Sequence, residues 1–164
     1  MPATPAVTVA AVVQTAGRFL IVEERINRRL QLNQPAGHVE RGETLLEAVV
    51  REAREESAWC FEPVAALGIY LWRTPLSGPP ILRFAFSGTV RDHDPTRPLD
   101  RGIVRTHWLT RAELEEQRAR LRSPLVLRCV EDFLAGCHGE LAPLAALTLE
   151  EATAYAGRAT VALL

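Results

Sequence analysis

The sequence contains no lysine, and all 19 of its basic residues are arginines, set against 20 acidic residues. The net charge of −1 lacks the basic excess that is typical of proteins that bind nucleic-acid polymers. No apolar run approaches the ~20 residues that cross a bilayer. The first residues, MPATP, lack the basic and apolar parts of a secretory signal. We therefore expect a soluble, cytoplasmic protein without a nucleic-acid polymer or a membrane as partner.

Cysteine is also scarce, with only Cys60, Cys129 and Cys137. An odd number without a close Cys-x-x-Cys pair, and without a histidine at ligand spacing, argues against a disulfide framework or a structural zinc site. We expect three reduced, partly buried thiols.

The 164 residues are enough for one domain. Apolar and β-branched patterns predict strands over 7–13, 18–23, 64–72, 81–90 and 103–109, with exposed loops over 25–30 and 91–102. Helices are expected over about 44–57, 111–121 and 125–134. The second would have a capping box at Thr110 and Glu113. The third would have Ser123 as its cap and Pro124 in its first position. We expect residues 1–140 to form the domain and 141–164 to form a tail or short helix packed on it.

The helix over 44–57 carries an unusual group of carboxylates. Glu52 and Glu56 lie one turn apart on one face, and Glu55 lies beside them. Three such groups repel one another unless hard divalent cations such as Mg²⁺ or Mn²⁺ bind them. Taken alone, the cluster is also compatible with an ordinary solvated helix face.

The wider segment favours the metal-binding interpretation. It resembles the Nudix box, which reads Gly-x5-Glu-x7-Arg-Glu-U-x-Glu-Glu-x-Gly-U, where U is a bulky apolar residue. The matching positions are Gly37, Glu43, Arg51, Glu52, Ala53, Glu55, Glu56 and Trp59. Ala53 is small for its position, and Ala58 replaces the second glycine, which in the family ends the helix in a left-handed conformation. We expect Ala58 to keep that exit, because the next strand then regains its alternating pattern.

The resemblance implies an α/β/α sandwich around a mixed β-sheet and Mg²⁺-dependent hydrolysis of nucleoside diphosphate derivatives, with Mn²⁺ as a substitute. By position, Glu52, Glu55 and Glu56 would bind metal together with the Gly37 carbonyl, and Glu52, Glu55 and Arg51 would be the catalytic residues. Arg51 would orient the glutamates, and Glu43 would fix the geometry of the motif. We favour Glu52 as the base that takes a proton from water.

A narrower resemblance, to a phosphatase branch of the family, rests on residues outside the box. Among them are Asn33-Gln34-Pro35-Ala36-Gly37-His38, Trp72, Arg83-Phe84 and 121–126. This branch releases orthophosphate from nucleoside di- and triphosphates and from hydroxymethylpyrimidine pyrophosphate, a thiamine precursor. Two other functions stay open: a pyrophosphohydrolase of an ADP-sugar or an oxidised nucleotide, and a non-catalytic nucleotide sensor. The sequence leaves a monomer and a homodimer equally open.

Four residues are candidates for substrate binding. Trp72 can stack on a base, Arg83 can bind a phosphate, Arg122 can hold an anion at the following helix start, and His38 can contact substrate. Each also has a structural alternative: a core aromatic residue, a surface ion pair, or a solvated loop. The run Asp92-His93-Asp94 is a further candidate for a ligand or base, and His107 is expected to be structural.

Overall fold

The computed structural model describes residues 4–73 and 78–141, and the expected C-terminal tail lies outside them apart from Leu141. The strands are β1 Ala6–Thr15, β2 Arg18–Ile26, β3 Arg29–Asn33, β4 Ala36–His38, β5 Cys60–Trp72, β6 Ile81–Arg91 and β7 Ile103–Leu109. The helices are α1 Leu45–Ser57, α2 Arg111–Glu116 and α3 Leu125–Leu134, with a 3₁₀ turn at Arg118–Arg120. Over these ranges, no helix is long and apolar enough to span a bilayer.

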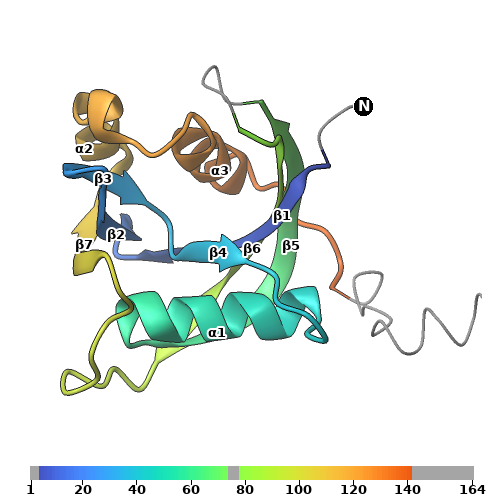
Figure 1. The fold of residues 1–164 in the computed structure, drawn as a ribbon, viewed down its shortest axis with the longest axis horizontal. Coiled ribbons are helices and arrows are strands. Elements are labelled where there is room, and N and C mark those ends of the chain that lie inside the picture. Colours follow the sequence, from blue (N-terminus) through green and yellow to red (C-terminus); the bar gives the residue numbers. More distant parts are fainter. Residues whose placement is uncertain (1–3, 74–77, 142–164) are drawn as a thin grey trace, which may run out of the picture.

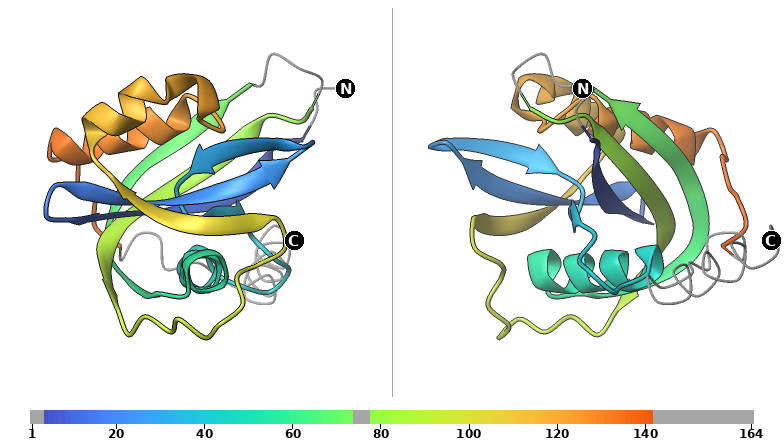
Figure 2. Two further views of the ribbon diagram at one scale, coloured as in Figure 1. Left: turned by 90° about the vertical axis from the view of Figure 1, so that its left-hand side faces the viewer. Right: turned by 45° about the vertical axis from the view of Figure 1, so that its right-hand side comes forward.

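The strands form a mixed sheet between two helical layers, with α1 on one side and α2 and α3 on the other (Figure 1). The main strand order is β3-β2-β1-β6-β5, with β4 also paired to β1 and β7 to β2. β1 and β6 run parallel, and the other pairs are antiparallel. Figure 2 shows the same layers from two further directions, with α1 seen end-on in the left view. The expected α/β/α sandwich is confirmed.

Strand β1 is the centre of the fold because it is buried on both faces and paired along both edges. Residues 9, 11 and 13 pack into the core beneath α1, whereas residues 10 and 12 pack into the core beneath α3. One edge of β1 pairs with β6 over Ala6–Val13. The other edge pairs first with β4 over Thr8–Ala10 and then with β2 at Gln14 and Thr15. Along this edge, β4 is therefore the neighbour of the first half of β1, and β2 is the neighbour of its last residues.

Helix α1 begins and ends as the sequence predicts. Thr44 and Glu47 form a reciprocal capping box, in which each side chain accepts a hydrogen bond from the other residue's N–H. At the other end, Ala58 adopts the left-handed conformation with φ 60° and ψ 12°, and its N–H donates to the Arg54 carbonyl at 3.1 Å. The expected left-handed exit is confirmed, although an alanine replaces the glycine of the motif.

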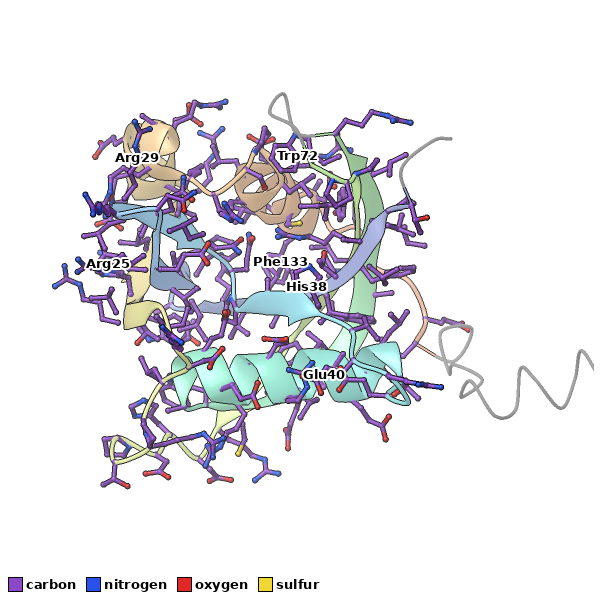
Figure 3. All side chains as sticks on the ribbon, viewed as in Figure 1. Arg25, Arg29, His38, Glu40, Trp72 and Phe133 are labelled. Carbon is purple, nitrogen blue, oxygen red and sulfur yellow. The ribbon has the colours of Figure 1, made fainter. Side chains whose placement is uncertain are left out.

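The prediction of an exposed loop over 25–30 is wrong. β2 and β3 continue as an antiparallel hairpin, in which Ile26 pairs with Arg29 around a tight turn. Asn27 and Arg28 both have positive φ, 48° and 67°. The turn lacks the glycine that normally marks this geometry, and the exposed Arg25 and Arg29 point away from the body of the molecule (Figure 3). The segment is polar because its end of the hairpin faces solvent.

Three further boundaries differ from the predictions. β5 begins at Cys60 rather than at residue 64, with register shifts that let this strand bend. α2 has the predicted capping box but ends at Glu116, where the 3₁₀ turn follows. Ser123 does not cap α3 with its side chain; Pro124 occupies the cap position, and the Ser123 hydroxyl has no hydrogen-bond partner among the described residues. The capping pattern therefore located the helix but not the role of the serine.

Candidate active site

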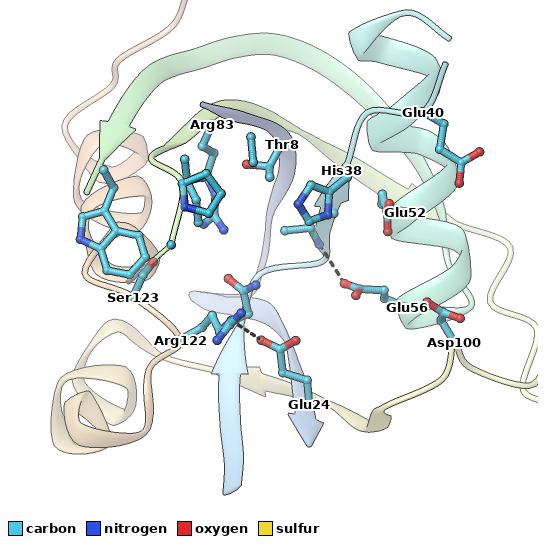
Figure 4. Close-up of a pocket in the computed structure, with 18 residues that line it drawn as sticks. Thr8, Glu24, His38, Glu40, Glu52, Glu56, Arg83, Asp100, Arg122 and Ser123 are labelled. Carbon is cyan, nitrogen blue, oxygen red and sulfur yellow. Dashed lines mark hydrogen bonds and ion pairs between the residues drawn. The ribbon is translucent and has the colours of Figure 1, made fainter. Parts of the chain in front are cut away.

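A pocket of about 580 Å³ opens beside the N-terminal half of β1, where β4 lies along one edge of that strand and β6 along the other. All four predicted substrate-binding residues line it: His38, Trp72, Arg83 and Arg122. Of the predicted metal ligands, Gly37, Glu52 and Glu56 also line the pocket. Glu55 is not among its lining residues, and its side chain is 38% exposed. The structure thus brings most of the predicted site into one cavity (Figure 4).

Gly37 has a clear steric reason to be glycine. A Cβ atom at this position would lie 2.1 Å from Glu52 Oε1 and 2.4 Å from Oε2. β4 therefore approaches α1 so closely that a side chain at this position would displace the Glu52 carboxylate. The first glycine of the motif leaves room for Glu52 in its observed position.

Arg51 connects the glutamates of the motif. It donates two hydrogen bonds to the Glu43 carboxylate, at 3.0 and 2.6 Å, and one to the His38 carbonyl at 3.0 Å. Its Nη1 also donates to Glu52 at 2.8 Å and to Glu55 at 3.1 Å. The hydrogen bonds to Glu43 raise the pKa of Arg51 above its usual range despite partial burial. These are contacts that an orienting arginine would make, and Glu43 holds that arginine in place.

Glu56 and Glu52 are both buried, with only 8% of each residue exposed. Burial raises the pKa of Glu56 to about 8, opposed by one hydrogen bond from the Ala36 N–H at 2.8 Å and reinforced by the nearby Glu52 charge. Burial likewise raises the pKa of Glu52, although Arg51 partly offsets the effect. Glu56 has no ion pair within the described part of the chain. Glu56 therefore lacks the positive charge that would stabilise its ionised form, whereas Glu52 has Arg51 beside it at 2.8 Å.

The donor chemistry fits a magnesium ion, but the protein alone does not form a complete cage. Within residues 4–73 and 78–141, no three His, Cys, Asp or Glu side chains are placed to hold one ion. Glu52 and Glu55 each accept a hydrogen bond from Arg51, whereas Glu56 accepts one from the Ala36 N–H instead. Mg²⁺ in enzymes commonly uses one or two carboxylates, several waters and the substrate phosphates. Glu52 and Glu56, with the Gly37 carbonyl, offer such a partial set of oxygen ligands.

Asp100 is a pocket residue that the sequence analysis missed. It belongs to the segment between β6 and β7, where its N–H donates to the Glu55 carbonyl at 2.9 Å, and its charge contributes to raising the pKa of Glu56. The run singled out in that segment, Asp92-His93-Asp94, does not line the pocket. Instead, Arg54 donates to the Asp92 carbonyl and pairs with Asp94 at 3.8 Å, which ties the loop to the end of α1. Nothing in the residue pattern distinguishes Asp100 from the other aspartates of this loop.

Histidine 107 has a structural setting, as expected. Its Nε2 lies 3.5 Å from the buried Glu23 carboxylate, which also accepts hydrogen bonds from Arg105 and Arg120. Burial tends to raise the pKa of Glu23, but the two arginines outweigh this effect and lower it. The cluster joins β2, β7 and the 3₁₀ turn, and none of its members lines the pocket.

A family model described as "NUDIX domain" matches residues 2–129 of the chain. With the fold and the motif geometry described above, the chain belongs to the Nudix family and is a Nudix hydrolase. It is similar to Phosphatase NudJ of Escherichia coli K12, with 41% identity over 132 residues, which cover 80% of this chain and 85% of that protein. A NUDIX hydrolase from Nitrosomonas europaea has a similar structure, with a TM-score of 0.86 and 43% identity over 88% of this chain and 98% of that one. A C. elegans Ap4A hydrolase shares the fold, with a TM-score of 0.56 and 20% identity over 80% of this chain and 98% of that one.

Proposed function

We propose that the chain is a Mg²⁺-dependent Nudix phosphatase that releases orthophosphate from nucleoside di- and triphosphates or from hydroxymethylpyrimidine pyrophosphate. The observation that carries this proposal is the pocket, in which the buried carboxylates face the buried Arg83, with the partly exposed Arg122 at the rim. A substrate with a diphosphate group matches both sides of the pocket. Its oxygens can bind a divalent ion held by the carboxylates on one side and the arginine side chains on the other. The similarity to a phosphatase over most of both chains supports orthophosphate as the product.

The residues of the motif would have separate roles in metal binding and catalysis. Glu52 and Glu56, with the Gly37 carbonyl, would hold a divalent ion from the α1 side, and Glu55 would contribute from the rim. Arg51 holds the Glu52 side chain in one orientation through its hydrogen bond at 2.8 Å. When bound, the ion supplies charge neutralisation and an activated water. Glu52 would accept the proton of that water.

The substrate would contact the remaining lining residues. His38 follows Gly37 at the end of β4 and lies between the carboxylates and Arg83 in Figure 4. Trp72 lies at the end of β5 and offers an aromatic face for a base or pyrimidine ring. Arg122 pairs with Glu24 at 3.5 Å and remains 45% exposed, so it can reach an anionic substrate from the rim.

A product assay tests this function. Purified protein is incubated with Mg²⁺ and ADP, ATP, hydroxymethylpyrimidine pyrophosphate, ADP-ribose or an oxidised nucleoside triphosphate, and the products are separated chromatographically. We expect orthophosphate and a substrate shortened by one phosphate group. Nucleoside monophosphate with pyrophosphate or a sugar phosphate would indicate a pyrophosphohydrolase, and binding without turnover would indicate a sensor. Glu116→Gln, an exposed residue of α2, is the matched control for glutamate variants of the site.

A further inference from the structure

The wall of the pocket opposite the carboxylates contains buried polar atoms that have no hydrogen-bond partner. Arg83 is only 5% exposed, and neither its Nε nor its Nη1 has a partner in the described ranges. The same holds for Ser123 Oγ, Thr8 Oγ1 and Asn33 Oδ1, and all four residues line the pocket. Buried polar atoms in folded proteins are normally paired, because an unpaired donor costs about 1–3 kcal/mol. Those that can donate, on Arg83, Ser123 and Thr8, would be satisfied by an anionic ligand in the pocket.

Arg83 forms no ion pair within the described part of the chain, although the Glu24 carboxylate is close enough for its charge to act on the guanidinium. Arginine stays protonated in proteins, so burial of its guanidinium requires an anion or carries a large energetic cost. Glu24 is the carboxylate of this wall, and it pairs with Arg122 at 3.5 Å. Behind Arg83 lies the Cys129 thiol, whose pKa burial raises to about 11, so the thiol is neutral at physiological pH. No salt bridge of Arg83 is formed among the described residues.

The N-terminus of α3 adds a second source of positive potential. The first N–H groups of a helix have no partner within the helix and attract anions. No side chain caps α3, and the free Ser123 hydroxyl immediately precedes its cap residue, Pro124. Figure 4 shows Arg83 and Ser123 on the side of the pocket opposite Glu52 and Glu56.

We propose that Arg83, Ser123 and the N-terminus of α3 form a subsite, here called the phosphate chamber, that binds the terminal phosphate group of the substrate and thereby makes orthophosphate the product. This inference rests on the proposed function. It adds that the substrate binds with its terminal phosphate group in the phosphate chamber. The hydroxyls of Ser123 and Thr8 and the amide of Asn33 can each turn a donor towards an oxyanion. Together with the guanidinium they supply donors for a phosphate group with three free oxygens.

The chemistry of the step balances without a further reactant. With the terminal phosphate in the phosphate chamber, the anhydride bond that joins it to the next phosphorus lies towards the carboxylates. Hydrolysis breaks one P–O bond of that anhydride; the hydroxyl of water adds to one phosphorus, and the proton of water compensates the oxygen released on the other. The products are orthophosphate and a substrate shortened by one phosphate group. A substrate whose last phosphate carries a sugar offers the chamber fewer oxygens and a bulkier group.

Binding of inorganic phosphate to the metal-free protein tests the chamber directly. In EDTA, isothermal titration calorimetry and thermal melts with inorganic phosphate are compared for wild type, Arg83→Met, Ser123→Ala and the control Arg111→Met, whose residue lies outside the pocket. Loss of a charge-assisted contact corresponds to roughly a 10- to 100-fold weaker phosphate affinity for Arg83→Met, with a smaller loss for Ser123→Ala. We expect Arg83→Met to melt no lower than wild type without phosphate, because it removes a buried, uncompensated charge.

Equal phosphate affinity in wild type and Arg83→Met would overturn the inference, as would absence of phosphate binding by wild type at millimolar concentration. Ser123→Ala decides the case if Arg83→Met does not fold. Steady-state kinetics with Mg²⁺ then separate this inference from the proposed function. A wild-type protein that releases no orthophosphate would refute the proposed function while the phosphate titration still stands. An Arg83→Met protein that hydrolyses ADP with unchanged KM would refute the chamber alone.

Discussion

Replacement of Glu56 by glutamine should stabilise the metal-free protein, because the folded structure holds this carboxylate in an unfavourable environment. The pKa of Glu56 is near 4.5 in an unfolded chain and about 8 in the folded protein. The folded state therefore binds the proton more tightly, and the free energy of unfolding falls as pH rises from about 4.5 to about 8. Glutamine has the same shape, carries no charge, and can still accept the hydrogen bond from the Ala36 N–H.

The expected magnitude follows from the difference between the two pKa values. At pH 7 the unfolded chain has Glu56 ionised, whereas the folded protein holds it mostly protonated, and this difference lowers the free energy of unfolding by about 3 kcal/mol, a cost that glutamine would remove. For a protein of this size, that corresponds to a rise in Tm of roughly 6–12 °C. Near pH 4.5 the carboxyl is protonated in the folded state and about half protonated in the unfolded state, so the two proteins should differ in stability by less than about 0.5 kcal/mol. The gain should thus grow with pH across the interval between the two pKa values.

Urea unfolding in EDTA at pH 4.5, 6, 7 and 8 measures this difference. Glu116→Gln makes the same chemical change at an exposed position and should shift stability by less than about 0.5 kcal/mol. Added Mg²⁺ should reverse the order, since it stabilises only the folded state that binds it, and glutamine is the weaker ligand. A gain that does not depend on pH, or a loss of stability at pH 7, would refute the reasoning.

Three further predictions concern the same motif. Mg²⁺ or Mn²⁺ should raise the Tm of wild type much more than that of a Glu52/Glu55/Glu56 triple glutamine variant, and equal shifts in thermal melts would place the metal elsewhere. Gly37→Ala should lower kcat at least tenfold, because the added Cβ would lie 2.1 Å from Glu52 Oε1 and displace the carboxylate. Circular dichroism should show that the fold is retained, and an unchanged kcat would contradict the importance of that close approach. Ala58→Gly should keep activity and raise the free energy of unfolding, measured with urea, by up to about 1 kcal/mol, since glycine tolerates φ 60° without strain. A clear loss of stability would mean that burial of the alanine methyl group matters more.

The parts of the fold with strong periodicity could be predicted from the sequence. The boundaries and left-handed exit of α1 agree with its pattern of apolar positions and its caps. The apolar run over 7–13 correctly indicates a strand buried on both faces. The β2–β3 hairpin could not be predicted, because Asn27 and Arg28 adopt positive φ without glycine, and tertiary pairing rather than local preference sets this turn.

For the candidate site, the spacing of residues predicts contacts within one loop and helix. It does not predict contacts between elements that are distant in the sequence. The motif spacing identifies Arg51 as the partner of Glu43 and Glu52, since all belong to one loop and helix. The position of Asp100 in the pocket depends on how a long connection returns to α1, which one sequence does not reveal. Similarly, no residue pattern indicates that Arg83 is buried without an ion pair among the described residues, because nearby groups such as Glu24 and Cys129 belong to elements far from it in the sequence.

The double pairing of β1 has a kinetic consequence. Its amides are bonded to β6 on one edge and to β4 or β2 on the other, and the same strands carry the walls of the pocket. Hydrogen exchange at residues 9–12 should therefore require global unfolding, whereas the exposed end of the β2–β3 hairpin should exchange through local opening. The strands beside the pocket are therefore expected to keep their spacing in the native state. A change in the width of the pocket would have to come from lining residues outside these strands, such as Asp100 and Ser123.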